Sequence, residues 1–236
     1  DEWLERAAGP APTEFYTWPH AQGVLTKSNT RLEAGAATEP LGALKGWVDD
    51  VFMANYVLSG FLRLGSLVPP LVPGTNKLVT SLASDRRFSD RSHAVFTSPR
   101  SFKFREMEYA LPIEAVPTAL REVHRMIDAR VWKISMPSEV RAAAADDLWL
   151  STAHGRTTGY IAVHRVSTER LGDYFTELEA IFRAHDGRPH WGKMHQRTAA
   201  DLAPAYPRFN DFVALRDRLD PQRRFQNGYL RQVLGD

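Results

Sequence analysis

The chain has 236 residues and no cysteine, which excludes disulfides, thiolate metal sites and a cysteine nucleophile. Hydrophobic residues make up 43% and charged residues 25%, as is typical of a globular protein with a hydrophobic core. The net charge of +2 is too small and too scattered to indicate binding to nucleic acid.

The N-terminal stretch DEWLERAAG is charged and lacks the apolar core of a signal peptide. It is typical of the end of a helix that begins upstream, with Gly9 and Pro10 ending it, so we expect a fragment or a processed chain.

The next stretch predicts a β-hairpin. Phe15 to Trp18 and Val24 to Asn29 form its strands, and Gly23 allows a turn with positive φ.

Residues 36–82 are predicted to be helical but irregular, because Pro69, Pro70 and Pro73 interrupt them. The longest apolar run, residues 51–62, is shorter than the roughly 20 residues that a membrane-spanning helix needs. We expect it to form a buried or interface helix, and docking on a partner or a membrane surface is the alternative. A cytoplasmic protein is expected, with membrane association left open.

Strand and helix patterns then alternate along the chain. Strands are predicted at residues 102–109, 131–143 and 157–166, and helices at residues 168–185 and 209–219. A further helix carries the apolar stripe Ile113, Val116, Leu120, Val123 and Ile127, and Pro117 favours a start at that residue. The order predicts an α+β fold, with a largely antiparallel sheet that helices cover on one face.

Alternation along KISMPSEVRA separates its side chains onto two faces. Ile134, Met136 and Val140 are expected to point into the helix-covered core, and Glu139 and Arg141 to share the opposite face.

The strand GYIAVHRV adds His164 to the face of Glu139 and Arg141 if Ile161 and Val163 join the core. Such a group is either a solvated ion pair beside a structural histidine or a polar wall for a polyhydroxylated ligand. In the second case Glu139 accepts from hydroxyls and Arg141 donates to an oxygen that gains charge.

Two other kinds of site are not expected. His185, His190 and His195 are five residues apart, which places them off a single strand face and off a single helix stripe, so no metal site is predicted. The chain contains no G-x-G-x-x-G, no G-x-x-x-x-G-K-[ST] and no G-x-S-x-G motif. A dinucleotide cofactor would therefore need another domain to hold it.

Six segments together resemble the aldonolactone oxidase branch of the vanillyl-alcohol-oxidase-type flavoproteins. They occur in that family's order and approximate spacing, and they are EFYTWPH, VLTKSNTR, FREMEYALP, SEVRAAAADDLWLS, RPHWGKMH and LDPQRRFQNGYL. The branch includes gulonolactone, galactonolactone and arabinonolactone oxidases and dehydrogenases, with alditol oxidases close by. The resemblance spans essentially the whole chain.

The resemblance implies a two-part protein in which an N-terminal domain holds FAD and a substrate domain, or cap, covers the flavin ring. Residues 1–195 are similar to the cap, and residues 196–236 to a C-terminal helical tail that packs toward the FAD-binding domain. FAD would then be held mainly by a domain that this chain lacks, and we expect the chain alone to be inactive.

The resemblance also implies substrate contacts. Glu139 and Arg141 match the family's Glu-x-Arg pair, which contacts substrate hydroxyls beside the flavin, and His164 matches a histidine near the substrate of alditol oxidases. Val166 stands where alditol oxidases have a hydroxyl residue, which counts against a strict alditol oxidase.

Cofactor contacts are implied for RPHWGKMH. Lys193 matches a lysine near the pyrimidine side of the flavin, where a cation stabilises the reduced ring. His190 adjoins this group, Trp191 would wall the pocket, and Gly192 would let the backbone approach the flat ring. The alternative for this loop is a simple turn with a packed indole.

The implied activity is oxidation of a carbinol of a sugar 1,4-lactone, of the arabinono or gulono type, with oxygen or another acceptor. Glu139, Arg141 and Lys193 would be the catalytic residues. Oxidation of an alditol is one alternative. Two others are a non-catalytic module that binds sugars or a protein, and an interaction domain that docks through residues 51–62.

Overall fold

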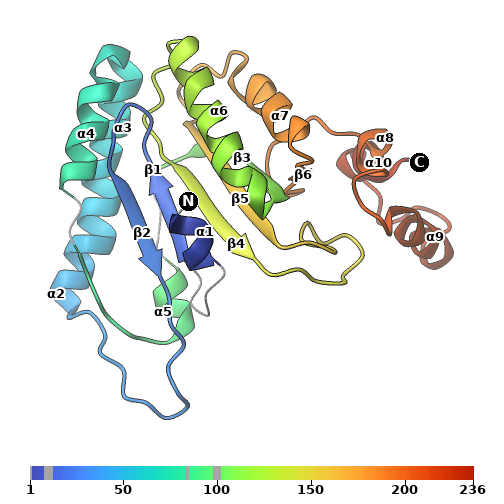
Figure 1. Cartoon of the computed structure of the whole chain (residues 1–236), viewed down its shortest axis with the longest axis horizontal. Coiled ribbons are helices and arrows are strands. Elements are labelled where there is room, and N and C mark those ends of the chain that lie inside the picture. Colours follow the sequence, from blue (N-terminus) through green and yellow to red (C-terminus); the bar gives the residue numbers. More distant parts are fainter. Residues whose placement is uncertain (1, 8–12, 83–84, 98–101) are drawn as a thin grey trace.

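An antiparallel sheet of six strands lies at the centre of the molecule, with the strand order β2-β1-β4-β5-β3-β6 (Figure 1). The computed structural model describes residues 2–7, 13–82, 85–97 and 102–236. The strands are β1 Thr13–Thr17, β2 Val24–Ser28, β3 Phe104–Pro112, β4 Ser138–Ala143, β5 Thr158–Val166 and β6 Arg188–Pro189. The predicted α+β class with an antiparallel sheet is confirmed.

Two helices, α6 (Val116–Ala129) and α7 (Tyr174–Ala184), cover one face of this sheet (Figure 1). Their apolar stripes pack on alternate residues of the strands. This core contains Met107, Tyr109, Leu111, Val123, Ile127, Val140, Ile161, Val163, Leu178 and Phe182, all essentially inaccessible. Each such side chain contributes about 1.5–3 kcal/mol on burial, so the core fixes which face of every strand points away from the helices.

The remaining helices lie mostly at the two ends of the molecule (Figure 1). One end has α2 Ala43–Gly46, the π-helix η1 Trp47–Val57, α3 Leu58–Leu67, the 3₁₀ turn η2 Pro69–Leu71 and α4 Val72–Ser81. The other has α8 Ala199–Leu202, α9 Phe209–Leu219 and α10 Gly228–Leu234. Short elements elsewhere are α1 Glu2–Ala7, α5 Ser92–Phe96 and η3 Ile113–Ala115.

Several predicted elements are confirmed. The hairpin forms as β1 and β2, with Phe15 opposite Thr26. The helix predicted at residues 209–219 has those bounds, and α6 begins beside Pro117. Helices α8 and α10 were not predicted. The predicted helix end at Gly9 and Pro10 lies outside the described residues.

The prediction for Met136 is wrong. Ile134 and Val140 lie in the core as expected, but Met136 packs with Leu62 and Val166 on the opposite face of the sheet. The regular strand begins only at Ser138, because Pro137 cannot donate a ladder hydrogen bond. Alternation therefore does not continue through this proline.

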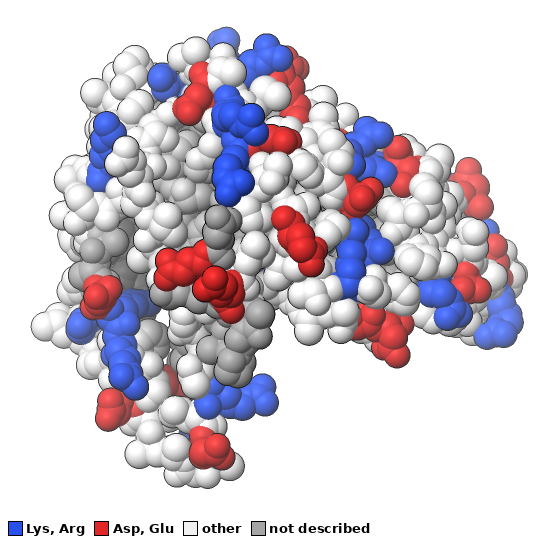
Figure 2. Space-filling view, in the orientation of Figure 1, with Lys and Arg blue, Asp and Glu red and all other residues white. Residues whose placement is uncertain are grey.

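The apolar run at residues 51–62 is partly exposed and partly buried. Phe52 and Tyr56 are exposed, whereas Leu62 is buried. Among the described residues, none of the helices is both long enough and apolar enough to cross a membrane. Basic and acidic side chains are interspersed over the face of the molecule shown in Figure 2.

Candidate active site

The sheet face opposite α6 and α7 carries a row of charged side chains. Glu139 and Arg141 project from β4, and β5 places His164 on the same face while Ile161 and Val163 enter the core. This is the arrangement that alternation predicted. The register explains it, since Glu139 lies opposite Ala162 and Arg141 opposite Tyr160.

Strand β3 adds two glutamates to this face that the sequence analysis did not single out. Glu106 lies opposite His164 and Glu108 opposite Ala162. The spacing in FREMEYALP could have indicated them, because two carboxylates two residues apart on a strand share a face. Their partners could not be named without the neighbouring strands.

Lys193 reaches the same face from the loop after β6. The backbone of this loop follows the edge of β3: His190 N donates to Glu108 O at 2.9 Å, and Met194 N to Glu106 O at 2.9 Å. The Lys193 ammonium then donates to the Glu106 carboxylate at 2.5 Å and to the Glu108 carboxylate at 2.6 Å. The loop is therefore fixed by β3 at both backbone and side-chain level.

Glu108 joins the two cations of the site. Its side chain is only 3% exposed, and it accepts from both Lys193 and Arg141. Arg141 also pairs with Glu139, with Nε 3.3 Å from Oε1. Burial opposes the charge on Arg141, but Glu108 and Glu139 outweigh it and raise the guanidinium pKa above its usual value. Arg141 is thus a fixed, permanent cation.

Glu106 links Lys193 to His164. Burial alone would raise the pKa of Glu106, but hydrogen bonds and charges from His164 and Lys193 outweigh it and lower the pKa from 4.5 to about 2. His164 Nε2 lies 3.2 Å from this carboxylate, and Nδ1 lies 2.8 Å from Pro137 O. His164 therefore joins Glu106 on β3 to the backbone just before β4.

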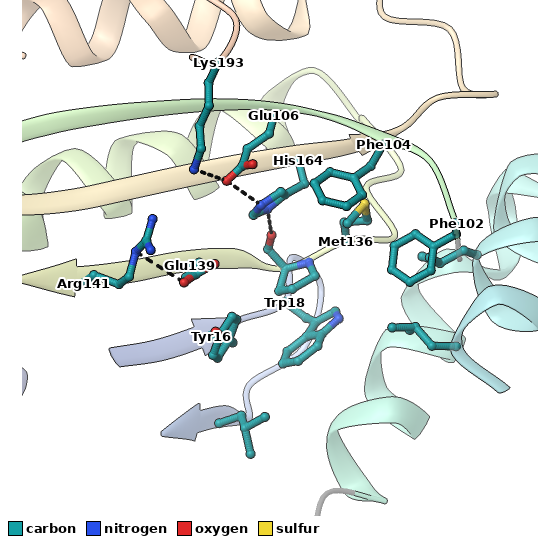
Figure 3. A pocket seen from close by; sticks show the side chains of 14 residues that line it. Tyr16, Trp18, Phe102, Phe104, Glu106, Met136, Glu139, Arg141, His164 and Lys193 are labelled. Atoms are coloured by element: carbon teal, nitrogen blue, oxygen red, sulfur yellow. Dashed lines mark hydrogen bonds and ion pairs between the residues drawn. The ribbon is translucent and has the colours of Figure 1, made fainter. Parts of the chain in front are cut away.

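A cavity of about 400 Å³ opens on these side chains (Figure 3). One part of its lining is charged: Glu106, Glu139, Arg141, His164 and Lys193. The other part is mostly aromatic and aliphatic: Tyr16, Trp18, Leu25, Leu58, Leu62, Phe102, Phe104, Met136 and Pro137. The arrangement can hold a small polar molecule with several oxygens, since it offers fixed donors and acceptors side by side.

Comparison with known proteins identifies the family to which this chain belongs. The family profile described as D-arabinono-1,4-lactone oxidase matches residues 1–233. L-gulono-1,4-lactone dehydrogenase of Mycobacterium tuberculosis is 41% identical over 225 residues, which cover 94% of this chain and 51% of that protein. L-gulonolactone oxidase of Bos taurus is 30% identical over 227 residues, which cover 93% and 50% of the two chains. The chain belongs to the D-arabinono-1,4-lactone oxidase family.

This membership confirms the resemblance drawn from the six segments. The chain spans about half the length of the curated relatives that it matches. A solved structure of a mutant cholesterol oxidase from Brevibacterium sterolicum has the same fold, with a TM-score of 0.64 and 13% identity, over 94% of this chain and 53% of that one.

The remaining residues that the family resemblance implicated lie around Lys193. Gly192 lines a shallow depression beside Lys193 and Glu106, and its N–H donates to His190 Nδ1 at 3.0 Å. Trp191 is not among the residues that line the 400 Å³ cavity, and its expected role beside the flavin stays a prediction. The indole instead packs edge-on against Tyr206 at the C-terminal helices, 5.9 Å between centroids.

The three evenly spaced histidines contact three different partners. His185 Nε2 lies 3.0 Å from Glu122, and His195 Nε2 lies 2.8 Å from the Tyr229 hydroxyl. His190 accepts from its own loop, as described above.

Proposed function

We propose that this chain forms the substrate-binding half of an FAD-dependent oxidoreductase that oxidises a carbinol of a sugar 1,4-lactone. The observation that carries this proposal is the meeting of Glu139, Arg141 and Lys193 on one cavity wall. The three come from β4 and from a loop about fifty residues further on, and Glu108 binds both cations directly.

Arg141 and Glu139 are suited to the substrate. Arg141 carries a charge that its two carboxylate partners orient, and its side chain remains 40% exposed toward the cavity side. It would donate to the substrate oxygen as that oxygen loses its proton. Glu139 would accept hydrogen bonds from neighbouring hydroxyls and so align the carbinol carbon.

Lys193 is suited to contact a flavin. It is a cation held in place by Glu106 and Glu108. A bound flavin would supply the acceptor for the hydride of the carbinol. Lys193 would then face the pyrimidine side, with His190, Trp191 and Gly192 shaping the adjoining loop.

A lactone rather than an alditol is the substrate that we propose. Val166 is buried with Leu62 and Met136, so this position offers no hydroxyl to a linear polyol. The relatives reported above are also named for lactones.

We propose the domain division that the resemblance implied: residues 1–195 as the cap and residues 196–236 as a tail that packs toward an FAD-binding domain. The separate apolar cluster of the C-terminal helices supports this division. It contains Leu202, Tyr206, Phe209, Val233 and Leu234.

The experiment uses the flavin-loaded full-length protein. Bleaching of the flavin absorbance is followed with L-gulono-1,4-lactone, D-arabinono-1,4-lactone, xylitol and sorbitol. We expect the lactones to bleach the flavin with the higher kcat/KM, and Glu139→Ala to lower that value at least tenfold, because hydroxyl alignment is lost. Absence of bleaching by any lactone, or unchanged kinetics in Glu139→Ala, would contradict the proposal.

A further inference from the structure

We infer that the cavity binds an amphiphilic substrate, in which a polar lactone head carries an alkyl chain. This inference rests on the proposed function, since it concerns the substrate class of the same site. It follows from the composition of the cavity wall, whose charged part occupies only one side (Figure 3).

The apolar side of the cavity is built from several elements besides the β1–β2 hairpin. Helix α3 contributes Leu58 and Leu62, the start of β3 contributes Phe104, and the segment before β4 contributes Met136. Leu62 and Met136 are 3% and 5% exposed and pack together with Val166. These residues form a firm wall whose neighbours hold it in place.

This apolar wall offers no hydrogen-bonding partner to hydroxyl groups. A hydroxyl placed against Leu58, Leu62 or Phe104 loses its water and gains no hydrogen bond, which disfavours binding. A fully hydroxylated sugar can therefore use the charged part of the cavity but not the rest. An alkyl chain gains free energy there, because it leaves water for an apolar surface.

The two parts of the cavity are close enough for one small molecule to span them. Phe104 and Glu106 are two residues apart on the same face of β3, about 7 Å along the strand. The ring of Phe104 meets the imidazole of His164 edge-on, with centroids 5.5 Å apart. A lactone head beside His164 and Glu106 would thus point its substituent past Phe104 toward α3.

The binding experiment uses γ-alkyl-γ-butyrolactones, from γ-hexalactone to γ-undecalactone, which have no hydroxyl group to oxidise. Their Kd for the flavin-loaded full-length protein is measured by calorimetry. We expect Kd to fall about twofold to fourfold for each added methylene until the cavity is filled. A Kd independent of chain length would overturn the inference and would indicate that another part of the protein covers the apolar wall.

Variants on α3 locate the alkyl chain. Leu58→Asn should flatten the dependence of Kd on chain length, and Leu58→Trp should shorten the longest chain that still gains affinity. Leu64→Asn and Leu64→Trp are the controls, because Leu64 lies on the same helix, is exposed and does not line the cavity. An equal effect at positions 58 and 64 would overturn the inference.

The outcomes separate this inference from the proposed function. If L-gulono-1,4-lactone bleaches the flavin while Kd is independent of chain length, the amphiphilic substrate is contradicted and the lactone activity stands. If Kd falls with chain length but no carbinol bleaches the flavin, the proposed oxidation is contradicted and the apolar binding site stands.

Discussion

Glu108 is the residue on which the charged wall depends. A buried carboxylate is costly unless it is paired, and here two cations pair with it at once. In return it fixes Arg141 and Lys193 relative to each other, although they lie on different elements. This pairing explains how one face of the sheet can present two cations at a set spacing.

Glu106 makes the stability of the protein depend on pH in the acid range. Its pKa of about 2 in the folded state lies below its ordinary 4.5, so its contribution is complete above about pH 4.5 and is lost as pH falls through 2. Glu106→Gln should lower the free energy of unfolding by about 2–3 kcal/mol at pH 7.

Urea denaturation at pH 7, 4.5 and 3, followed by tryptophan fluorescence, tests this expectation. The difference between wild type and Glu106→Gln should shrink at pH 3. Glu114→Gln is the control, because Glu114 is an exposed glutamate just after the same strand. A difference that stays constant with pH would rule out the ionised pair.

Alternation along the strands predicted the site residues on β4 and β5 but not those on β3. Glu139, Arg141 and His164 could be placed on one face because each lies in a regular strand next to apolar neighbours that face the core. Glu106 and Glu108 obey the same rule on β3. Their role stayed hidden because it arises from the pairing of β3 with β5, which brings together residues about sixty positions apart.

Among the elements, α7 positions the loop that carries Lys193. Glu179 of α7 is buried, and it accepts from the Tyr109 hydroxyl at 2.5 Å and from Gln196 N at 2.9 Å. Burial, and then the hydrogen bond to Glu179, raise the pKa of Tyr109 well above its usual value, so the hydroxyl stays a donor. The helix, β3 and the loop are thus joined at one carboxylate.

Glu179→Ala should lower the free energy of unfolding by about 2–4 kcal/mol, because it leaves a buried hydroxyl and a backbone N–H unpaired. Glu177→Ala on the same helix should cost less than about 1 kcal/mol, since its partner Arg130 has a side chain that is 55% exposed. Equal losses in urea denaturation would show that Glu179 does not hold the loop.

Element prediction succeeded where periodicity was long and failed where it was short or interrupted. The stripe of α6 covers four turns and identified the helix. Helices α8 and α10 have four and seven residues, too few for a periodic signal. Pro137 ends the alternation before β4, which is why Met136 faces the cavity rather than the core.

At the scale of the whole molecule, Arg188 of β6 attaches the C-terminal helices to the sheet. Its guanidinium is largely buried and donates to Ala205 O at 2.8 Å, to Thr152 O at 3.1 Å and to His154 O at 2.8 Å. The strand order itself could not be predicted, because it depends on pairings between segments distant in sequence.

Arg188→Met should loosen this attachment, because three carbonyls lose their donor and the cation no longer lies over Tyr206. Hydrogen exchange of the amides in α8, α9 and α10 should become at least about tenfold faster, while β3 and β5 keep their protection. Arg218→Met is the control, because Arg218 is exposed on α9. Unchanged exchange in Arg188→Met would show that the tail is held by other contacts.

The proposed function requires that the charged wall act on the substrate beside a flavin. Its most direct test is the rate of flavin reduction by L-gulono-1,4-lactone without oxygen, in the flavin-loaded full-length protein. Arg141→Ala should slow this rate by about 10²–10³, because the developing charge on the substrate oxygen loses its donor. Arg125→Ala, at an exposed position of α6 on the other side of the sheet, should leave the rate unchanged. Equal rates in wild type and Arg141→Ala would contradict the account.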